Sequence, residues 1–163
     1  MLCFSHGEAS TLGPGSAGLR RIRAGEPAAA AAVLGTTGTT LLDYPDGGLA
    51  SIPATTLAAR VHRHVQLAHP DALLVFDEDG ITGHPDHSQA TAAALSAAGQ
   101  PGLPVIAWAI PRHVAALLNA HFGTSFAGRP PEQIGTAITV EAPPGSRRSP
   151  VTAASPRTIR CCW

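Results

Sequence analysis

The chain has 163 residues, 13% of them charged, and its formal net charge at pH 7 is zero. This length suits one domain with a hydrophobic core, and the low, balanced charge argues against nucleic acid or an anionic membrane as partner. A small molecule is therefore the expected ligand. No apolar run approaches the roughly 20 residues that cross a bilayer, and no secretory signal opens the chain, so we expect a cytoplasmic location.

Short β-type runs alternate with alanine-rich helical stretches along the chain, which is typical of a parallel sheet covered by helices. Residues 1–6 (MLCFSH) predict a strand, and the glycine-rich residues 11–18 a mobile loop beside its end. Residues 22–35 predict a helix with Pro27 near its first turn and Gly35 as its stop. Residues 39–44 (TTLLDY) then predict a strand that the turn PDGG closes.

The second half continues this alternation. Residues 53–69 predict a helix, and residues 72–77 (ALLVFD) a continuous apolar strand that ends in an acidic loop. A helix up to residue 99 opens at the tetrapeptide HPDH, with Pro85 at its first position. Residues 103–110 predict a further buried strand; a helix over 112–121 and a short strand near 137–140 follow. The sequence therefore predicts an α/β fold.

The tetrapeptide HPDH, residues 84–87, follows a predicted strand at the end where open parallel sheets bind ligands. In one interpretation, His84 and Asp86 cap the helix, Pro85 forms its first turn and His87 is a polar surface residue. In another, one histidine ligates a divalent metal while the other, oriented by the carboxylate, transfers protons. The spacing alone leaves both interpretations open.

Four blocks of this sequence, in this order, resemble the LmbE-like, PIG-L-type zinc de-N-acetylases. CFSHGEASTLG resembles the strand and loop after the family's first metal motif, IRAGEPAAAAAVLG its arginine–glutamate helix, LLDYPDGGL its acidic turn, and GITGHPDHSQA its second metal motif. The resemblance implies a Rossmann-like, three-layer, mostly parallel sheet.

The resemblance also implies a reaction, the hydrolysis of an N-acetyl amide on an amino-sugar glycoside. It makes His87 a zinc ligand and His84 the catalytic histidine that stabilises the oxyanion or protonates the leaving amine, with Asp86 tuning it. Such chemistry needs a Lewis acid, a base and a polar group facing the tetrahedral intermediate. The residues expected to bind the sugar are Glu8, Arg23 and Asp46.

Each of these three residues also has an ordinary structural interpretation. Arg23 and Glu26 could form a surface ion pair, Asp46 could simply make its turn, and Glu8 could be solvated.

One departure from the family concerns the metal. The family's upstream motif His-Pro-Asp-Asp-Glu supplies two zinc ligands and the general base, and this sequence does not contain it. His69-Pro70 follows a predicted helix, so it is no substitute. We therefore expect that Met1 is an internal start, that the first strand and the N-terminal metal motif are missing, and that the zinc site is incomplete and the chain inactive.

The predicted organisation is a deacetylase-like domain over residues 1–141 and an irregular tail over 142–163. The Pro, Arg, Ser and Ala bias of that tail resembles GC-rich coding sequence read out of frame. Two other functions are a catalytically inactive relative that binds a sugar and an α/β domain of nucleotide-binding type. The last is disfavoured because the glycines of residues 10–18 lack the Gly-x-Gly-x-x-Gly order.

Overall fold

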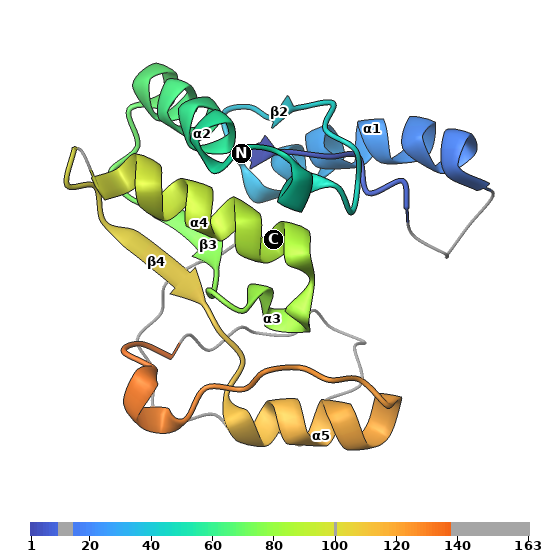
Figure 1. Ribbon diagram of the computed structural model, residues 1–163, viewed down its shortest axis with the longest axis vertical. Helices are drawn as coiled ribbons and strands as arrows, with labels where there is room; N and C mark the ends of the chain where they lie inside the picture. Colours follow the sequence, from blue (N-terminus) through green and yellow to red (C-terminus); the bar gives the residue numbers. More distant parts are fainter. Residues whose placement is uncertain (10–14, 100, 138–163) are drawn as a thin grey trace. The chain divides into compact units, whose positions relative to one another are not determined.

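The computed structural model describes residues 1–9, 15–99 and 101–137. Contacts divide the chain into two compact units, Met1–Trp108 and Ala109–Trp163. In the first unit, helices and strands alternate along the chain (Figure 1). This alternation agrees with the predicted α/β class.

The described strands pair in parallel, as predicted. β1 (Leu2–Cys3) pairs with β2 (Thr40–Leu41), and β3 (Leu73–Phe76) pairs with β4 (Val105–Trp108). They form two separate two-stranded sheets. β1 and β2 are shorter than the predicted strands, and the three-layer Rossmann-like arrangement stays a prediction.

Several predicted helices are confirmed. α2 (Ala54–Ala68) begins after Pro53 and ends before His69, which adopts the left-handed conformation (φ 45°) that often ends helices. α4 begins at Pro85, whose missing N–H costs nothing at a first helical position. The helices of the first unit are α1 (Gly15–Leu34), the 3-10 helix η1 (Leu49–Ser51), α2 (Ala54–Ala68), α3 (Gly80–Gly83) and α4 (Pro85–Gly99).

The start of α1 corrects the sequence prediction. The helix already includes residues 15–18, which were predicted as loop, so Pro27 lies inside it rather than in its first turn. A proline removes one hydrogen bond of the helix, and a helix of 20 residues retains most of the others. Gly35, with φ 65°, ends the helix as predicted.

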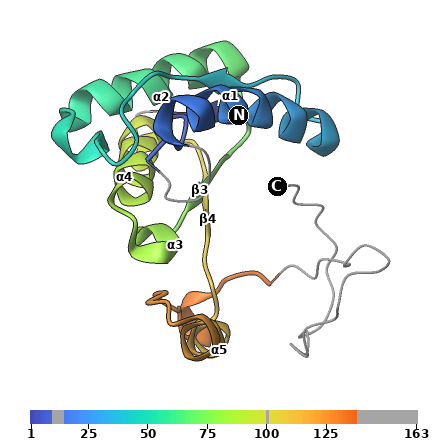
Figure 2. The ribbon, with the colours of Figure 1, turned by 90° about the vertical axis from the view of Figure 1, so that its right-hand side faces the viewer.

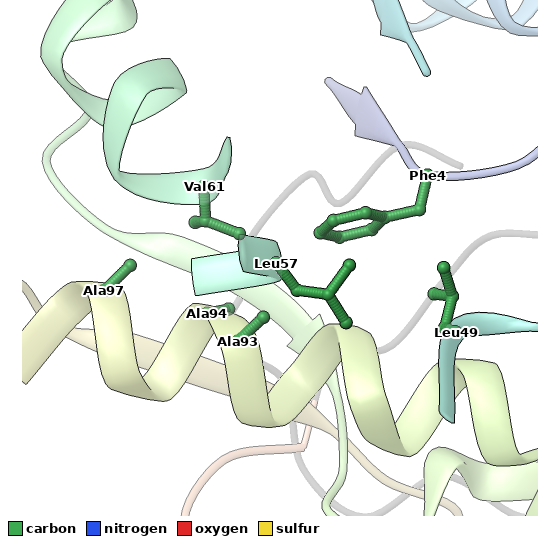
Figure 3. Packing of buried hydrophobic residues seen from close by; sticks show 7 residues of the cluster. All are labelled: Phe4, Leu49, Leu57, Val61, Ala93, Ala94 and Ala97. Carbon is green, nitrogen blue, oxygen red and sulfur yellow. The ribbon is translucent and has the colours of Figure 1, made fainter. Parts of the chain in front are cut away.

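The core of the first unit lies between α2, α4 and the strands. Leu57 and Val61 of α2 pack against an alanine face of α4 (Figure 3). Alanines leave room for the two helices to approach closely, and Leu57 is fully buried. The buried members of this cluster are Phe4, Leu49, Leu57, Val61, Ala93, Ala94 and Ala97.

α4 packs on one side of the β3–β4 pair (Figure 2). The prediction of a buried strand over residues 103–110 is wrong for one face of the β3–β4 pair, since Leu74 is 52% exposed, Ile106 58% and Trp108 41%. Side chains alternate between the two faces of a strand, so these residues belong to the face opposite the core. An apolar run predicts a strand but does not show that both its faces are covered.

The second unit contains α5 (Arg112–Phe122) and the 3-10 helix η2 (Pro131–Gln133). The side chain of Asn119 near the end of α5 accepts the N–H of Phe126 at 2.8 Å and donates to its carbonyl at 3.2 Å. A Cβ at Gly128 would lie 2.5 Å from the Cα of Arg112, so this close approach requires glycine. α5 confirms the helix predicted over 112–121.

Some predictions concern residues outside the described ranges. These are most of the strand near 137–140, the domain boundary at 141 and the tail 142–163. Among the described residues, no helix has the length and apolarity to span a membrane.

Candidate functional site

The HPDH segment begins α4 and lies just after β3 and α3. The Nδ1 atom of His84 accepts the backbone N–H of Asp86 at 3.2 Å. This bond satisfies one of the free N–H groups of the first helical turn, so His84 acts as a cap. Nδ1 is thereby an acceptor, and the proton of the neutral ring lies on Nε2.

Asp86 is 5% exposed, and its carboxylate binds a different part of the chain. One oxygen accepts the N–H of Gly47 at 2.8 Å and the other that of Leu49 at 3.0 Å. Gly47 lies in, and Leu49 directly after, the turn closed by the bond from Gly48 N to the Pro45 carbonyl at 3.1 Å. Asp86 thus links the start of α4 to the predicted acidic turn.

His87 lies in a well-defined ring environment. Its imidazole stacks on Phe76 at a centroid distance of 4.5 Å and lies 5.1 Å from the ring of His84. Nδ1 of His87 contacts the Gly80 carbonyl at 3.1 Å and must donate to it, because a carbonyl only accepts. The Nε2 lone pair is left available, which is the usual arrangement of a metal-ligating histidine.

The acidic turn also contacts the residues after β1. One oxygen of Asp46 accepts the N–H of Ala9 at 2.8 Å, and the other accepts the hydroxyl of Ser5 at 3.3 Å. The N–H of Asp46 donates to Glu8 Oε1 at 3.3 Å. Asp46 therefore does more than make its own turn, and Glu8 lies beside it.

Arg23 lies against the same segment after β1, next to Glu8. A Cβ at Gly7 would lie 2.9 Å from Arg23 Nη1, so the guanidinium packs across the backbone between His6 and Glu8. The Arg23–Glu26 pair is not among the ion pairs of the described residues. Three buried polar atoms lack a hydrogen-bond partner there, namely His6 Nδ1, Glu8 Oε2 and Arg23 Nε.

The sequence reasoning missed His6, Arg20 and Asp43. His6 Nε2 donates to Asp43 at 2.9 Å, Arg20 pairs with the same carboxylate, and Arg20 also lies 3.6 Å from Glu8. The hydrogen bond from His6, with the charge of Arg20, lowers the pKa of Asp43. The sequence did contain a signal for the contact between His6 and Asp43. Each residue lies at the carboxyl end of a strand, and the carboxyl ends of two neighbouring parallel strands lie side by side.

The metal prediction is only partly supported by geometry. Within residues 1–9, 15–99 and 101–137, no group of three or more His, Cys, Asp or Glu side chains is placed to hold a metal ion. His87 offers one nitrogen, and both oxygens of Asp86 already accept backbone N–H groups. Zinc takes three or four protein ligands, so the described residues do not complete a zinc site.

Comparison with known families assigns the chain to a family. Residues 1–98 match the model of the family "PIG-L: GlcNAc-PI de-N-acetylase". The chain belongs to the PIG-L de-N-acetylase family. The matched range contains all six predicted site residues, from Glu8 to His87.

Two curated relatives of this PIG-L chain are both named 1D-myo-inositol 2-acetamido-2-deoxy-α-D-glucopyranoside deacetylase. The protein from Acidothermus cellulolyticus is 33% identical over 154 residues, which cover 74% of this chain and 53% of the relative. The protein from Nakamurella multipartita is 38% identical over 60 residues, or 37% of this chain and 19% of the relative. The chain thus spans about half the length of the first relative. No solved structure matches it.

Proposed function

We propose that the chain carries the sugar-binding residues and one zinc-ligating histidine of a hydrolase that removes the N-acetyl group from an amino-sugar glycoside. Its family and the names of both relatives support this activity, and those names suggest an inositol glycoside of N-acetylglucosamine as substrate. The observation that carries the proposal is the pair of hydrogen bonds from the acidic turn to Asp86. They hold the HPDH segment close to Asp46, whose N–H donates to Glu8.

The proposed division of labour follows from the hydrogen bonds of each side chain. His84, with its proton on Nε2, can donate to the oxygen that becomes negative when the amide is attacked. Glu8 Oε2 and Arg23 Nε provide an unpartnered acceptor and donor, which suit sugar hydroxyl groups. Asp86 binds the backbone of the acidic turn, so we assign it the role of positioning Asp46 and Glu8 rather than of contacting the substrate.

Zinc would polarise the amide carbonyl and acidify a water molecule. His87 is the residue here that we propose to ligate it, through Nε2. Because the described residues supply one such nitrogen and the sequence lacks the His-Pro-Asp-Asp motif, we expect the 163-residue chain alone to bind zinc weakly and to release no acetate at a useful rate.

A second function follows from the same asymmetry. The proposed sugar-binding residues Glu8 and Asp46 contact one another, whereas no three potential metal ligands lie together within the part of the chain that the structure describes, and this favours a glycoside-binding protein if the chain acts by itself. Calorimetric titration with the N-acetylglucosaminyl inositol glycoside measures that binding without requiring turnover.

The test compares the 163-residue chain with a version extended upstream by any in-frame codons for His-Pro-Asp-Asp. Zinc content and acetate release from N-acetylglucosaminyl compounds are measured for both. We expect metal and activity in the extended chain, and their loss in its His87→Ala variant but not in His113→Ala, an exposed histidine of α5. An inert extended chain, or no effect of His87→Ala, would refute the deacetylase proposal.

A further inference from the structure

We propose that Asp77 is a positioning residue for His87. It holds the peptide unit between Gly80 and Ile81 so that the Gly80 carbonyl faces Nδ1 of the imidazole and keeps the ring proton there. The proposal rests on the metal-ligating role proposed above for His87. It concerns the tautomer of that ring, however, which can be measured without zinc, substrate or turnover.

Asp77 follows β3 directly and is 4% exposed. Its N–H donates to the Trp108 carbonyl at 2.9 Å, which continues the pairing of β3 with β4 by one residue. Its carboxylate then binds the chain that follows, where Oδ1 accepts the N–H of Asp79 at 3.0 Å and that of Ile81 at 3.4 Å. The end of the strand thus fixes the position of an acceptor for the next turn.

The peptide unit between Gly80 and Ile81 is held at both ends. Its N–H, on Ile81, donates to Asp77, and its carbonyl, on Gly80, accepts from Nδ1 of His87 at 3.1 Å. This peptide is trans and planar, so its N–H and C=O point in opposite directions. Rotation of the unit would therefore break both bonds together. The acceptor at Asp77 selects the orientation in which the carbonyl meets His87.

The turn needs such support because its backbone is strained. Ile81 has φ 62° and ψ −56°, a combination that β-branched residues rarely adopt. Strained dihedral angles persist only where the surrounding contacts over-determine them. Burial of the Ile81 side chain, which is 3% exposed, is one such contact, and the bond to Asp77 is another that acts on the strained residue itself.

The ring of His87 depends on this carbonyl for its tautomer. Stacking on Phe76 at 4.5 Å fixes the plane of the ring but does not distinguish its two nitrogens. Neutral histidine in water favours the tautomer with its proton on Nε2, so an acceptor at Nδ1 has to hold the other form. The turn comes close enough because residue 80 is glycine, where a Cβ would lie 2.8 Å from the Cβ of His87.

A serine at position 77 separates this positioning role from simple capping of the turn. In Asp77→Ser the hydroxyl can still accept the N–H of Asp79, as serines do in such turns. Its oxygen lies one bond short of the carboxylate oxygen, so it does not reach the N–H of Ile81, which is already 3.4 Å from Asp77. Capping alone predicts no change at His87 in this variant, whereas positioning predicts one.

The test reads the tautomer of His87 from long-range proton–nitrogen NMR correlations at about pH 8.5, where an ordinary imidazole is neutral. The signals of His87 are those that disappear in His87→Gln. We expect the Nδ1–H form to predominate in the 163-residue chain. Its ratio to the Nε2–H form should fall about tenfold in Asp77→Ala and in Asp77→Ser, the effect of losing about one hydrogen bond.

Two matched variants are the controls. Asp77→Asn keeps an acceptor oxygen for the N–H of Ile81 and should leave the ratio within about twofold. Glu78→Ala removes an exposed carboxylate from the next residue and should leave it equally unchanged. Circular dichroism checks that each variant remains folded, and if Asp77→Ala unfolds, Asp77→Ser decides because it retains the cap.

Several outcomes would overturn the proposal. A predominant Nε2–H form in the unmodified chain would show that Gly80 does not accept from His87. A ratio in Asp77→Ser equal to that in Glu78→Ala would make Asp77 a cap only, and an equal loss in Asp77→Asn would assign the effect to charge. Unfolding of both Asp77→Ala and Asp77→Ser would make Asp77 a residue of the fold. None of these results bears on the deacetylase proposal, which is decided by zinc content and acetate release in the extended chain.

Discussion

Asp86 is a buried carboxylate whose removal should destabilise the fold by a predictable amount. It accepts two backbone N–H groups, from Gly47 and Leu49, and thereby joins segments 37 to 39 residues apart. A hydrogen bond to a charged group is worth about 1.5–3 kcal/mol, and a buried N–H left without an acceptor costs about 1–3 kcal/mol. Water can reach the half-buried bond at Gly47 but not the buried one at Leu49.

We therefore expect Asp86→Ala to lower the free energy of unfolding by about 3 kcal/mol, and Asp86→Asn, which keeps one acceptor oxygen, by about half of that. Urea unfolding followed by circular dichroism measures both. Asp71→Asn is the matched control, because Asp71 is exposed, and it should change stability by less than about 0.5 kcal/mol. If Asp86→Ala costs no more than this control, the bridge does not hold α4 to the acidic turn.

Three further predictions concern other groups of the fold and the site. Gly80 and Gly83 both have positive φ, 68° and 71°, so replacing either by alanine should cost about 1–2 kcal/mol of backbone strain. A Cβ at Gly80 would also lie 2.8 Å from the Cβ of His87, whereas one at Gly83 meets no atom within 4 Å. Urea unfolding should therefore show a larger loss of stability for Gly80→Ala than for Gly83→Ala, and equal losses would contradict the close packing at Gly80. Burial lowers the pKa of His64, so the unfolded state binds more protons than the folded state just below pH 6.5, and the free energy of unfolding should rise with pH in that range. His64→Gln should flatten this rise when urea unfolding is repeated at several pH values, and an unchanged slope would show that His64 does not cause it. The hydrogen bond from His6 lowers the pKa of Asp43 below 3.8, and the stabilisation by the ionised Asp43 is lost as the pH falls through that lowered pKa. In His6→Phe, NMR should show the pKa of Asp43 closer to 3.8, and an unchanged pKa would show that His6 is not responsible.

Local patterns predicted the regular elements well. α2, α4 and α5 lie close to the ranges predicted for them, α4 with Pro85 at its first position, and the turn of residues 45–48 follows from its proline and glycines. The predicted start of α1 is wrong because the glycines of residues 15–18 favour a loop, whereas the structure includes them in the helix. Propensity is a weak guide where a long helix can absorb such residues.

The long-range contacts could not be predicted from spacing alone. Neither the bond from the Leu49 N–H to Asp86 nor that from the Ala9 N–H to Asp46 can be recognised from neighbouring residues in the sequence, because each joins residues 37 positions apart. The resemblance to a family placed Asp46 and Asp86 in one site without saying how they are connected. The exposure of Leu74 and Trp108 was missed for a related reason, since hydrophobicity reports a tendency to be buried and not the presence of a covering layer.

The capping and the catalytic interpretations of HPDH turn out to be compatible. His84 Nδ1 accepts a backbone N–H, which leaves the proton on Nε2, whereas His87 Nδ1 donates to a backbone carbonyl, which leaves a lone pair on Nε2. Two rings 5.1 Å apart thus present one proton donor and one electron-pair donor. A proton donor beside a metal ligand needs this opposite polarity. Because backbone groups of the helix start and of Gly80 impose it, replacing Asp86 should weaken the fold before it alters either imidazole.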